Sequence, residues 1–278
     1  MARAGRTGVA VMGRLLTLAA LIFLIAARRA VPVDSGPGTG FQGSAHDFSG
    51  EAAGSDQRTG HEVKSGPCTF CHTPHKAYGT RLLWNHTYSA NTYTWTEVTH
   101  TTGGTRLPTI RPDWTGPTVY CLSCHDGTVA VGDIAWFNRQ AWGGGRALDQ
   151  ERHASGSKNI ASTAGNMRGN HPVAHPYPFQ RTLSTYNQTT TGDGVDLRRF
   201  NPDPTSRGIR LFNDASGIVI AEPVTGRTGI ECSSCHGVHN ERGVVRDSKL
   251  LRGTRNPQEP DYLCTKCHSN LLEGNPHR

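Results

Sequence analysis

The chain has 278 residues, of which 35% are hydrophobic, 33 are glycine and 16 are proline, so it is too poor in apolar side chains for an ordinary protein core. Its formal net charge of +7 is misleading, because five arginines lie in the first 30 residues and the remainder carries 24 basic against 22 acidic side chains. This balance gives no basis for nucleic-acid binding through the release of counterions.

The first 30 residues have the pattern of an export signal. A basic start, with Arg3, Arg6 and Arg14 and no acidic residue, precedes an apolar run of 13 residues from Leu15 to Ala27. Such a run matches the core of a signal peptide and is short for a membrane-spanning helix. Residues 1–30 are therefore predicted to be an export signal peptide, with an uncleaved membrane anchor as the alternative. The mature protein is expected to be extracellular or at the cell surface, alternatively periplasmic, and to meet the membrane only during export.

All eight cysteines of the chain lie in four copies of the motif Cys-x-x-Cys-His. The copies, called the first to the fourth motif below, are Cys68–His72, Cys121–His125, Cys232–His236 and Cys264–His268. This spacing is typical of c-type haem attachment, in which both thiols bond to the haem and the histidine ligates its iron. Zinc sites and disulfides also use paired cysteines, but neither requires a histidine directly after every second cysteine. The motifs therefore predict four covalently attached haem c groups, bound by Cys68, Cys71, Cys121, Cys124, Cys232, Cys235, Cys264 and Cys267 and ligated by His72, His125, His236 and His268.

The motifs are arranged as an internal duplication. In each half, a motif with a further histidine three residues beyond its own, His75 or His239, precedes a motif without one. A polar, glycine-rich stretch from 143 to 170 separates the halves. The predicted organisation is a first dihaem half at 31–142, a linker at 143–170 and a second dihaem half at 171–278.

Long stretches of the chain lack helical or strand periodicity, including 143–170 and 188–208. The large apolar faces of four haems would supply the core that the side chains cannot, much as a structural metal organises a small domain. We therefore predict a small haem-organised multihaem cytochrome c that is mostly coil, with short helices at haem-attachment sites and little regular secondary structure. A few short strands are expected near 217–222.

Each iron also needs a ligand on its second face, and the choice of ligand separates electron transfer from catalysis. Met167 is the only methionine beyond the predicted signal, whereas ten histidines remain after the four in the motifs. Histidine on both faces, called bis-histidine ligation below, is therefore predicted. The reduction potentials are expected to be low, because the methionine ligand that raises them is missing.

Four histidines are predicted as the second, or distal, iron ligands. His75 and His239 occupy equivalent places in the two halves, and neither can readily reach the far face of its own haem, so each is expected to ligate a neighbouring haem. His46 and His171 lie ahead of the first and the third motif and are predicted to complete the set. The competing histidines, for which a surface or packing role is the preferred interpretation, are His61, His86 and His175. The histidines without supporting sequence context are His100, His153 and His277.

Several segments around the motifs resemble the doubled-CxxCH multihaem cytochromes. These segments are His46–Ser49, Cys68–His75, Leu83–Asn85, Cys121–Gly127, His171–Val173 and Cys232–Asn240. Within this group the chain is similar to the tetrahaem cytochromes that polymerise into extracellular filaments, the cytochrome nanowires. The resemblance implies parallel and T-shaped pairs of bis-histidine haems in a continuous chain, and a head-to-tail homopolymer. It also implies that one distal histidine is donated across a subunit interface, and His46 is the candidate by its N-terminal position.

The predicted function is electron transfer by an exported tetrahaem cytochrome that forms a conductive extracellular filament and exchanges electrons with other redox proteins or extracellular acceptors. The alternative is a monomeric periplasmic or extracytoplasmic carrier, or a subunit of a redox complex. A multihaem reductase would need an open coordination position beside acid or base groups. No attachment motif departs from Cys-x-x-Cys-His and histidines exceed the number needed, so no catalytic residue is predicted.

Overall fold

The computed structural model describes residue 46 and residues 68–79, 81–129, 133–135, 159–161, 165–239 and 250–269. All four Cys-x-x-Cys-His motifs lie within these ranges. The predicted export signal, most of the glycine-rich linker and the histidines His61, His153 and His277 lie outside the described residues. In the described part, no helix is long and apolar enough to cross a membrane.

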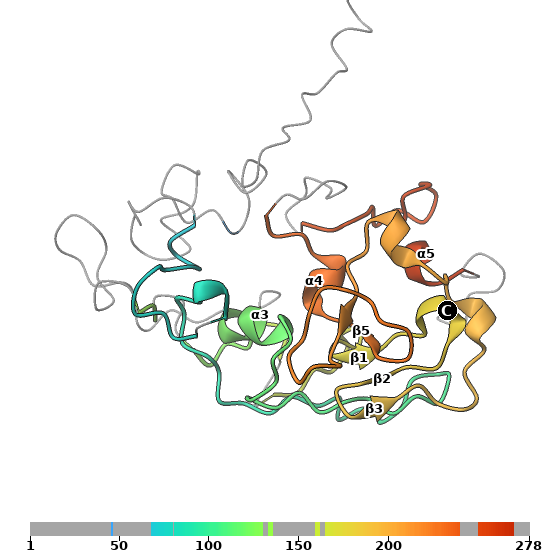
Figure 1. The fold of residues 1–278 in the computed structure, drawn as a ribbon, viewed down its shortest axis with the longest axis horizontal. Helices are drawn as coiled ribbons and strands as arrows, with labels where there is room; N and C mark the ends of the chain where they lie inside the picture. Colours follow the sequence, from blue (N-terminus) through green and yellow to red (C-terminus); the bar gives the residue numbers. More distant parts are fainter. Residues whose placement is uncertain are drawn as a thin grey trace, which may run out of the picture. The chain divides into compact units, whose positions relative to one another are not determined.

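Three of the four motifs form short α-helices. These are α3 (Thr118–His125), α4 (Cys232–Cys235) and α5 (Leu263–Cys267), shown in Figure 1. The first motif forms a turn instead, in which the His72 N–H donates to the Cys68 carbonyl over 2.9 Å. Single 3₁₀ turns lie at Arg81–Leu83, Phe179–Arg181, Leu197–Arg199 and Pro204–Arg207. Helices this short are not stable alone, so they depend on what packs against them.

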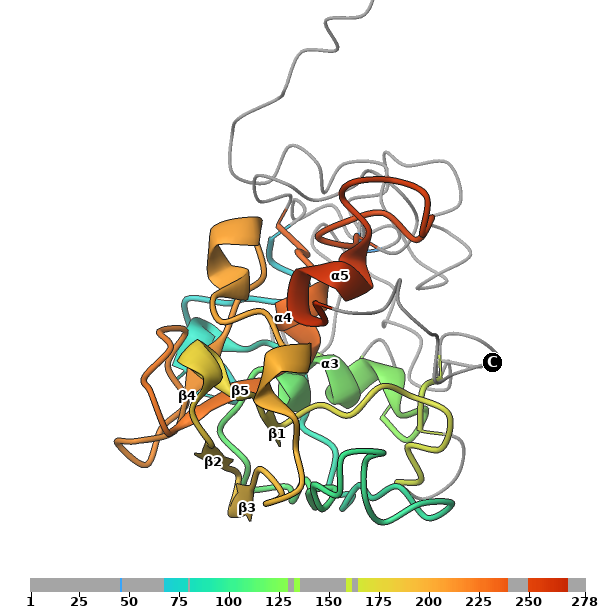
Figure 2. The same ribbon diagram turned by 90° about the vertical axis from the view of Figure 1, so that its right-hand side faces the viewer.

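Two small antiparallel sheets lie in the described part of the second half, so the predicted fold class, mostly coil with little regular secondary structure, is wrong on this point. The strands are β1 (His175–Pro176), β2 (Thr185–Tyr186), β3 (Thr189–Thr190), β4 (Phe212–Asn213) and β5 (Thr228–Ile230). One sheet has the order β1-β5-β4, and the other is the hairpin β2-β3 (Figure 2). Near 217–222, where strands were predicted, a single bridge joins Ile220 to Asn213.

The sequence does not reveal these strands because each spans only two or three residues. Alternation of apolar and polar side chains cannot be recognised over so few positions. Tertiary contacts fix the pairing instead, with His175 opposite Ile230 and Phe212 opposite Gly229. Gly229 is required by close packing, because a Cβ atom there would lie 2.2 Å from the Tyr186 ring.

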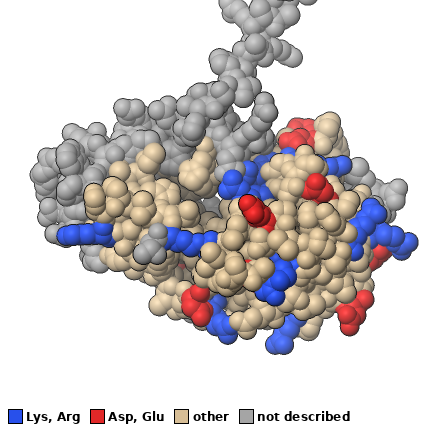
Figure 3. Space-filling model, in the orientation of Figure 1, with Lys and Arg blue, Asp and Glu red and all other residues tan. Residues whose placement is uncertain are grey.

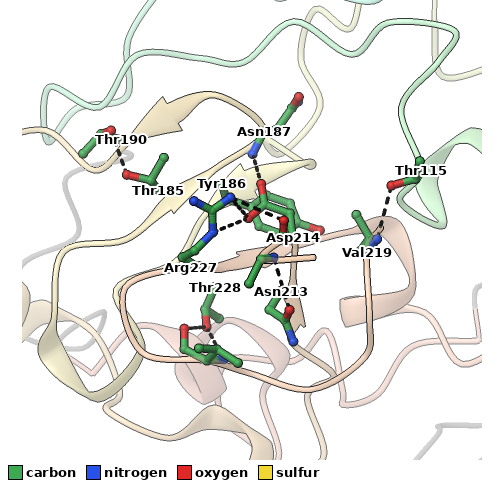
Figure 4. Close-up of polar contacts among 12 residues, drawn as sticks. Thr115, Thr185, Tyr186, Asn187, Thr190, Asn213, Asp214, Val219, Arg227 and Thr228 are labelled. Carbon is green, nitrogen blue, oxygen red and sulfur yellow. Dashed lines mark hydrogen bonds and ion pairs between the residues drawn. The ribbon is translucent and has the colours of Figure 1, made fainter. Parts of the chain in front are cut away.

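Asp214 ties the turn after β4 to the neighbouring elements (Figure 4). Its carboxylate accepts a hydrogen bond from the Asn187 N–H over 2.9 Å, at the tip of the β2-β3 hairpin. It also forms an ion pair with Arg227, just ahead of β5, with Nη2 3.0 Å from Oδ1. The Asp214 side chain is 12% exposed and that of Arg227 is 48% exposed, so this ion pair is only partly shielded from water. One half-buried carboxylate therefore connects the two sheets.

Buried apolar side chains gather in clusters that join segments distant in the sequence. One cluster consists of Tyr93, Trp95, Ile110, Leu122, Ala161, Met167 and Ala174. A second consists of Tyr177, Phe179, Ile209, Leu211 and Ile230, with Leu263 and Cys267 of α5 packed against it. Met167, the one methionine available as an iron ligand, is 1% exposed within the first cluster. The described end of the predicted linker therefore packs into the interior of the first half.

Candidate haem-binding site

The four motifs share a local geometry that brings the first cysteine and the histidine together. The N–H groups of His72, His236 and His268 each donate to the carbonyl of the first cysteine of the same motif, over 2.9, 3.0 and 2.9 Å. In the second motif, His125 is the last residue of α3. One helical turn thus places the histidine beside its cysteines, as attachment of one haem to all three side chains requires.

Consecutive motifs lie next to one another. Thiols within electrostatic reach of each other are Cys71 and Cys124, Cys121 and Cys232, and Cys235 and Cys267. Burial raises the pKa of the Cys124 thiol to about 12, with the charge of its neighbour as a further cause. The hydrogen bond with the Cys232 thiol is the largest cause that raises the pKa of the Cys121 thiol well above its usual value. The four attachment sites therefore form a row in the order of the chain.

Three motif histidines each contact a predicted distal histidine. The ring pairs are His72 with His239, His125 with His46, and His268 with His171, with centroids 6.0, 5.8 and 6.4 Å apart. In the pair of His125 and His46, the two Nε2 atoms face each other at 3.5 Å. Each pair joins segments far apart in the sequence, so the contacts arise from the tertiary fold.

These separations fit one iron between two imidazoles. Bonds between a metal and an imidazole nitrogen are about 2 Å long, so rings on opposite faces of one iron have centroids roughly 6 Å apart. All three ring separations lie close to that value, whereas the Nε2 atoms of His46 and His125, at 3.5 Å, are about 0.5 Å closer than two such bonds would place them. The donor set present in the described residues therefore suits bis-histidine haems at the first, second and fourth motifs.

No protein-family model and no curated protein matches this chain. All eight cysteines are free thiols, and no group of three or more His, Cys, Asp or Glu side chains converges on a metal-ion position within the described residues. The motifs and the histidine pairs are therefore the features of this chain that indicate a function.

Backbone carbonyls hold several histidines in the tautomer that ligates iron. The Nδ1 atoms of His72, His86, His171 and His175 lie 2.6, 2.9, 2.9 and 2.9 Å from the carbonyl oxygens of Leu82, Thr87, Pro172 and Pro176. A carbonyl oxygen only accepts, so Nδ1 must carry the proton. Nε2 then has the lone pair that binds a metal.

His75 differs from the other three predicted distal ligands. Its side chain is exposed, and its hydrogen bonds are local, with the Thr73 hydroxyl donating to the His75 carbonyl over 2.9 Å. Within the described residues, His75 makes no ring contact with a motif histidine. Its ligand role remains a prediction from the duplication.

His86 and His175, which were interpreted as surface or packing residues, have features of ligands. His86 is 1% and His175 is 9% exposed, and both have a proton held at Nδ1. Burial lowers the pKa of His175 to about 4, so its imidazole is neutral near pH 7. The repeated His-Pro pair, at His171 and again at His175, is the sequence signal that could have identified the latter.

A buried carboxylate shapes the turn after the second motif. Asp126, which follows His125, accepts hydrogen bonds from the Ser89 and Tyr93 hydroxyls over 2.5 and 2.8 Å and from the Thr128 N–H over 2.9 Å. Burial raises the pKa of Asp126, but these hydrogen bonds outweigh it and the pKa lies below its usual value. The charged carboxylate fixes the backbone beside His125, the predicted iron ligand.

Proposed function

We propose that this protein is an exported tetrahaem c-type cytochrome that carries electrons along a row of closely packed bis-histidine haems. The observation that carries the proposal is the contact of three motif histidines with three distal histidines at the spacing one iron requires. Covalently attached haem would supply reversible one-electron oxidation and reduction of iron. Four such groups suit electron transport between redox proteins or to extracellular acceptors.

The residues proposed to hold each haem determine whether a substrate could bind to its iron. The cysteines anchor each haem, and an imidazole on each face leaves no coordination position for a substrate. His239 of the third motif's segment contacts His72 of the first motif. By the symmetry of the duplication, His75 is proposed to ligate the haem of His236. Electron transfer without catalysis is the function that this ligand set favours.

Haem content tests this proposal directly. The chain would be produced in a host that attaches haem c during export, and haem would be measured per chain, with four expected. The double variant Cys264→Ala, Cys267→Ala should give three. The reduced protein should bind no carbon monoxide, because every iron is six-coordinate. A chain with no covalent haem would contradict the whole proposal, and carbon monoxide binding would instead favour an enzyme.

Polymerisation into an extracellular filament is proposed from the resemblance to the cytochrome nanowires. A head-to-tail contact that does not close into a ring produces an open filament. The resemblance implied that His46 serves a neighbouring subunit, whereas His46 contacts His125 of its own chain. Exchange of the N-terminal arm between copies would make the same ring contact between subunits.

Replacement of His46 by alanine separates the two arrangements. If the arm is exchanged, His46→Ala should abolish filaments in electron micrographs and leave one haem in four high-spin. If His46 acts within its own chain, filaments should persist while one haem still becomes high-spin. Discrete particles of the unchanged protein at every concentration and pH would favour the alternative, a monomeric carrier or subunit of a redox complex.

A further inference from the structure

The carboxylate of Glu231 lies buried between the second and the third motif. Glu231 is 0% exposed and directly precedes Cys232 at the start of α4. Its Oε2 accepts a hydrogen bond from the Thr118 N–H at the start of α3, over 3.1 Å. In return, the Thr118 hydroxyl oxygen accepts from the Cys232 N–H over 3.2 Å. The first turns of the two attachment helices are therefore bonded to each other.

Two aromatic side chains complete the environment of this carboxylate. Its Oε1 accepts from Trp114 Nε1–H over 3.1 Å and from the Tyr186 hydroxyl over 2.7 Å. Within α4, it also accepts from the backbone N–H of Ser234. Gly116 leaves the necessary room, because a Cβ atom there would lie 2.3 Å from Oε1. The pocket is thus built around the carboxylate by three segments of the chain, at 114–118, at Tyr186 and in α4.

Burial and hydrogen bonds act on the charge of Glu231 in opposite directions. Burial is the larger influence and leaves the pKa of the carboxyl group above its usual value, while the hydrogen bonds from Thr118, Tyr186 and Trp114 oppose that shift. The Thr118 N–H and the Trp114 Nε1–H can only donate, so they match a carboxylate, whereas the Tyr186 hydroxyl can also accept. These donors stabilise the ionised form in place of water.

The charge of Glu231 acts on both adjoining attachment sites. Their mutual hydrogen bond is the largest influence on the pKa values of the Cys121 and Cys232 thiols, and burial follows. The Glu231 charge then acts on both thiols in the direction that disfavours negative charge. These are the sulfurs that would bear the haems of the second and third motifs, called the inner haems below. Reduction adds a negative charge to a haem, so the same carboxylate would oppose it.

We propose that Glu231 positions the two inner haems, by bonding α3 to α4, and lowers their reduction potentials relative to the same sites with a neutral side chain. This inference rests on the proposed function, because it requires haems at the second and third motifs. Other charged groups around the cluster are Arg81, whose guanidinium donates to the carbonyls of Thr115 and Val219, and Asp214, which is paired with Arg227. Arg81 and Asp214 both lie within electrostatic reach of Tyr186, and Arg227 offsets the Asp214 charge.

The test compares Glu231→Gln with the unchanged holoprotein in a spectroelectrochemical titration. The two inner potentials should become more positive, while the two outer potentials stay in place and all four haems remain low-spin. His239→Met and His171→Met identify the outer potentials, because methionine ligation raises the potential of the haem concerned. Glu222→Gln is the matched control, since Glu222 is exposed in the same half and should move none.

Several results would overturn the inference. Equal movement of all four potentials, movement of the outer two only, or no movement would each exclude a local role of the Glu231 charge. If Glu231→Gln yields no holoprotein, the pH dependence of the inner potentials is measured in Tyr186→Phe instead. Removal of one donor raises the pKa of the carboxylate, so the inner potentials should rise at a higher pH on acidification than in the unchanged protein. Absence of covalent haem from the unchanged chain would instead contradict the proposed function.

Discussion

A buried imidazole nitrogen without a hydrogen bond lowers the stability of the folded protein by about 1–3 kcal/mol. Such a nitrogen is therefore expected to have a binding partner. His175 Nε2 is buried without a hydrogen-bond partner, while Nδ1 lies 2.9 Å from the Pro176 carbonyl oxygen. His175 also lies opposite Ile230, two residues ahead of Cys232. An iron at the third motif would give this nitrogen a partner, so His175 is the competitor of His75 for that haem.

Two alanine variants distinguish these residues. We expect His75→Ala to leave one haem in four high-spin and able to bind carbon monoxide, because the duplication makes His75 the ligand. His175→Ala should retain four low-spin haems in the absorption spectrum. The opposite pair of results would assign the ligand role to His175.

The contact of His171 with His268 predicts the effect of losing a single distal ligand. His171→Ala should open the iron of the fourth motif, so that about a quarter of the reduced haem binds carbon monoxide. His100→Ala is the control, because His100 is exposed and its Nδ1 lies 2.8 Å from the hydroxyl of adjacent Thr99. Unchanged spectra in His171→Ala would show that His171 is not a ligand of this iron.

At the scale of elements, two-residue strands depend on the side chains that connect them. Asp214→Ala removes the ion pair with Arg227 and the acceptor for the Asn187 N–H, and leaves Arg227 without its partner. We expect the free energy of unfolding of the holoprotein to fall by about 1–3 kcal/mol, measured with guanidinium chloride. The control Asp113→Ala, whose side chain is 86% exposed and 3.8 Å from Arg111, should have little effect.

At the same scale, sequence patterns predict the helices at the motifs but neither the strands nor the ligand pairs. Helices occur at Cys121, Cys232 and Cys264, where the motif spacing requires a helical turn. The strands could not be predicted, because the pairing of β5 with β1 and β4 depends on contacts such as that of Gly229 with Tyr186. The ligand pairs have the same limitation, since spacing identifies candidate histidines but not which rings meet.

The whole molecule is expected to depend on its haems for folding. Only 35% of the residues are hydrophobic, and the strands of the described part span two or three residues each, so we expect the polypeptide alone to supply too small a core. A variant with all eight motif cysteines replaced by serine should lack cooperative unfolding and be digested rapidly by protease, unlike the holoprotein. Cooperative unfolding of this variant, followed by circular dichroism, would show that the polypeptide alone supplies the core.

Charge gives the face drawn in Figure 3 no strong preference for one partner. On the face drawn in Figure 3, basic and acidic side chains are interspersed among uncharged ones. This agrees with the near balance of basic and acidic residues beyond the predicted signal. Contacts between copies in a filament would therefore depend on shape and ligand exchange more than on net charge.

The sequence by itself predicts the cofactor chemistry, because covalent attachment of haem c needs two cysteines and a histidine at a fixed local spacing that one helical turn provides. It also favours histidines as the distal ligands, since methionine is nearly absent. Only the tertiary structure decided that His239 meets His72, that His171 meets His268, and that Glu231 lies between two attachment helices. Those contacts join residues more than 90 positions apart, and no local pattern specifies which distant segments pack together.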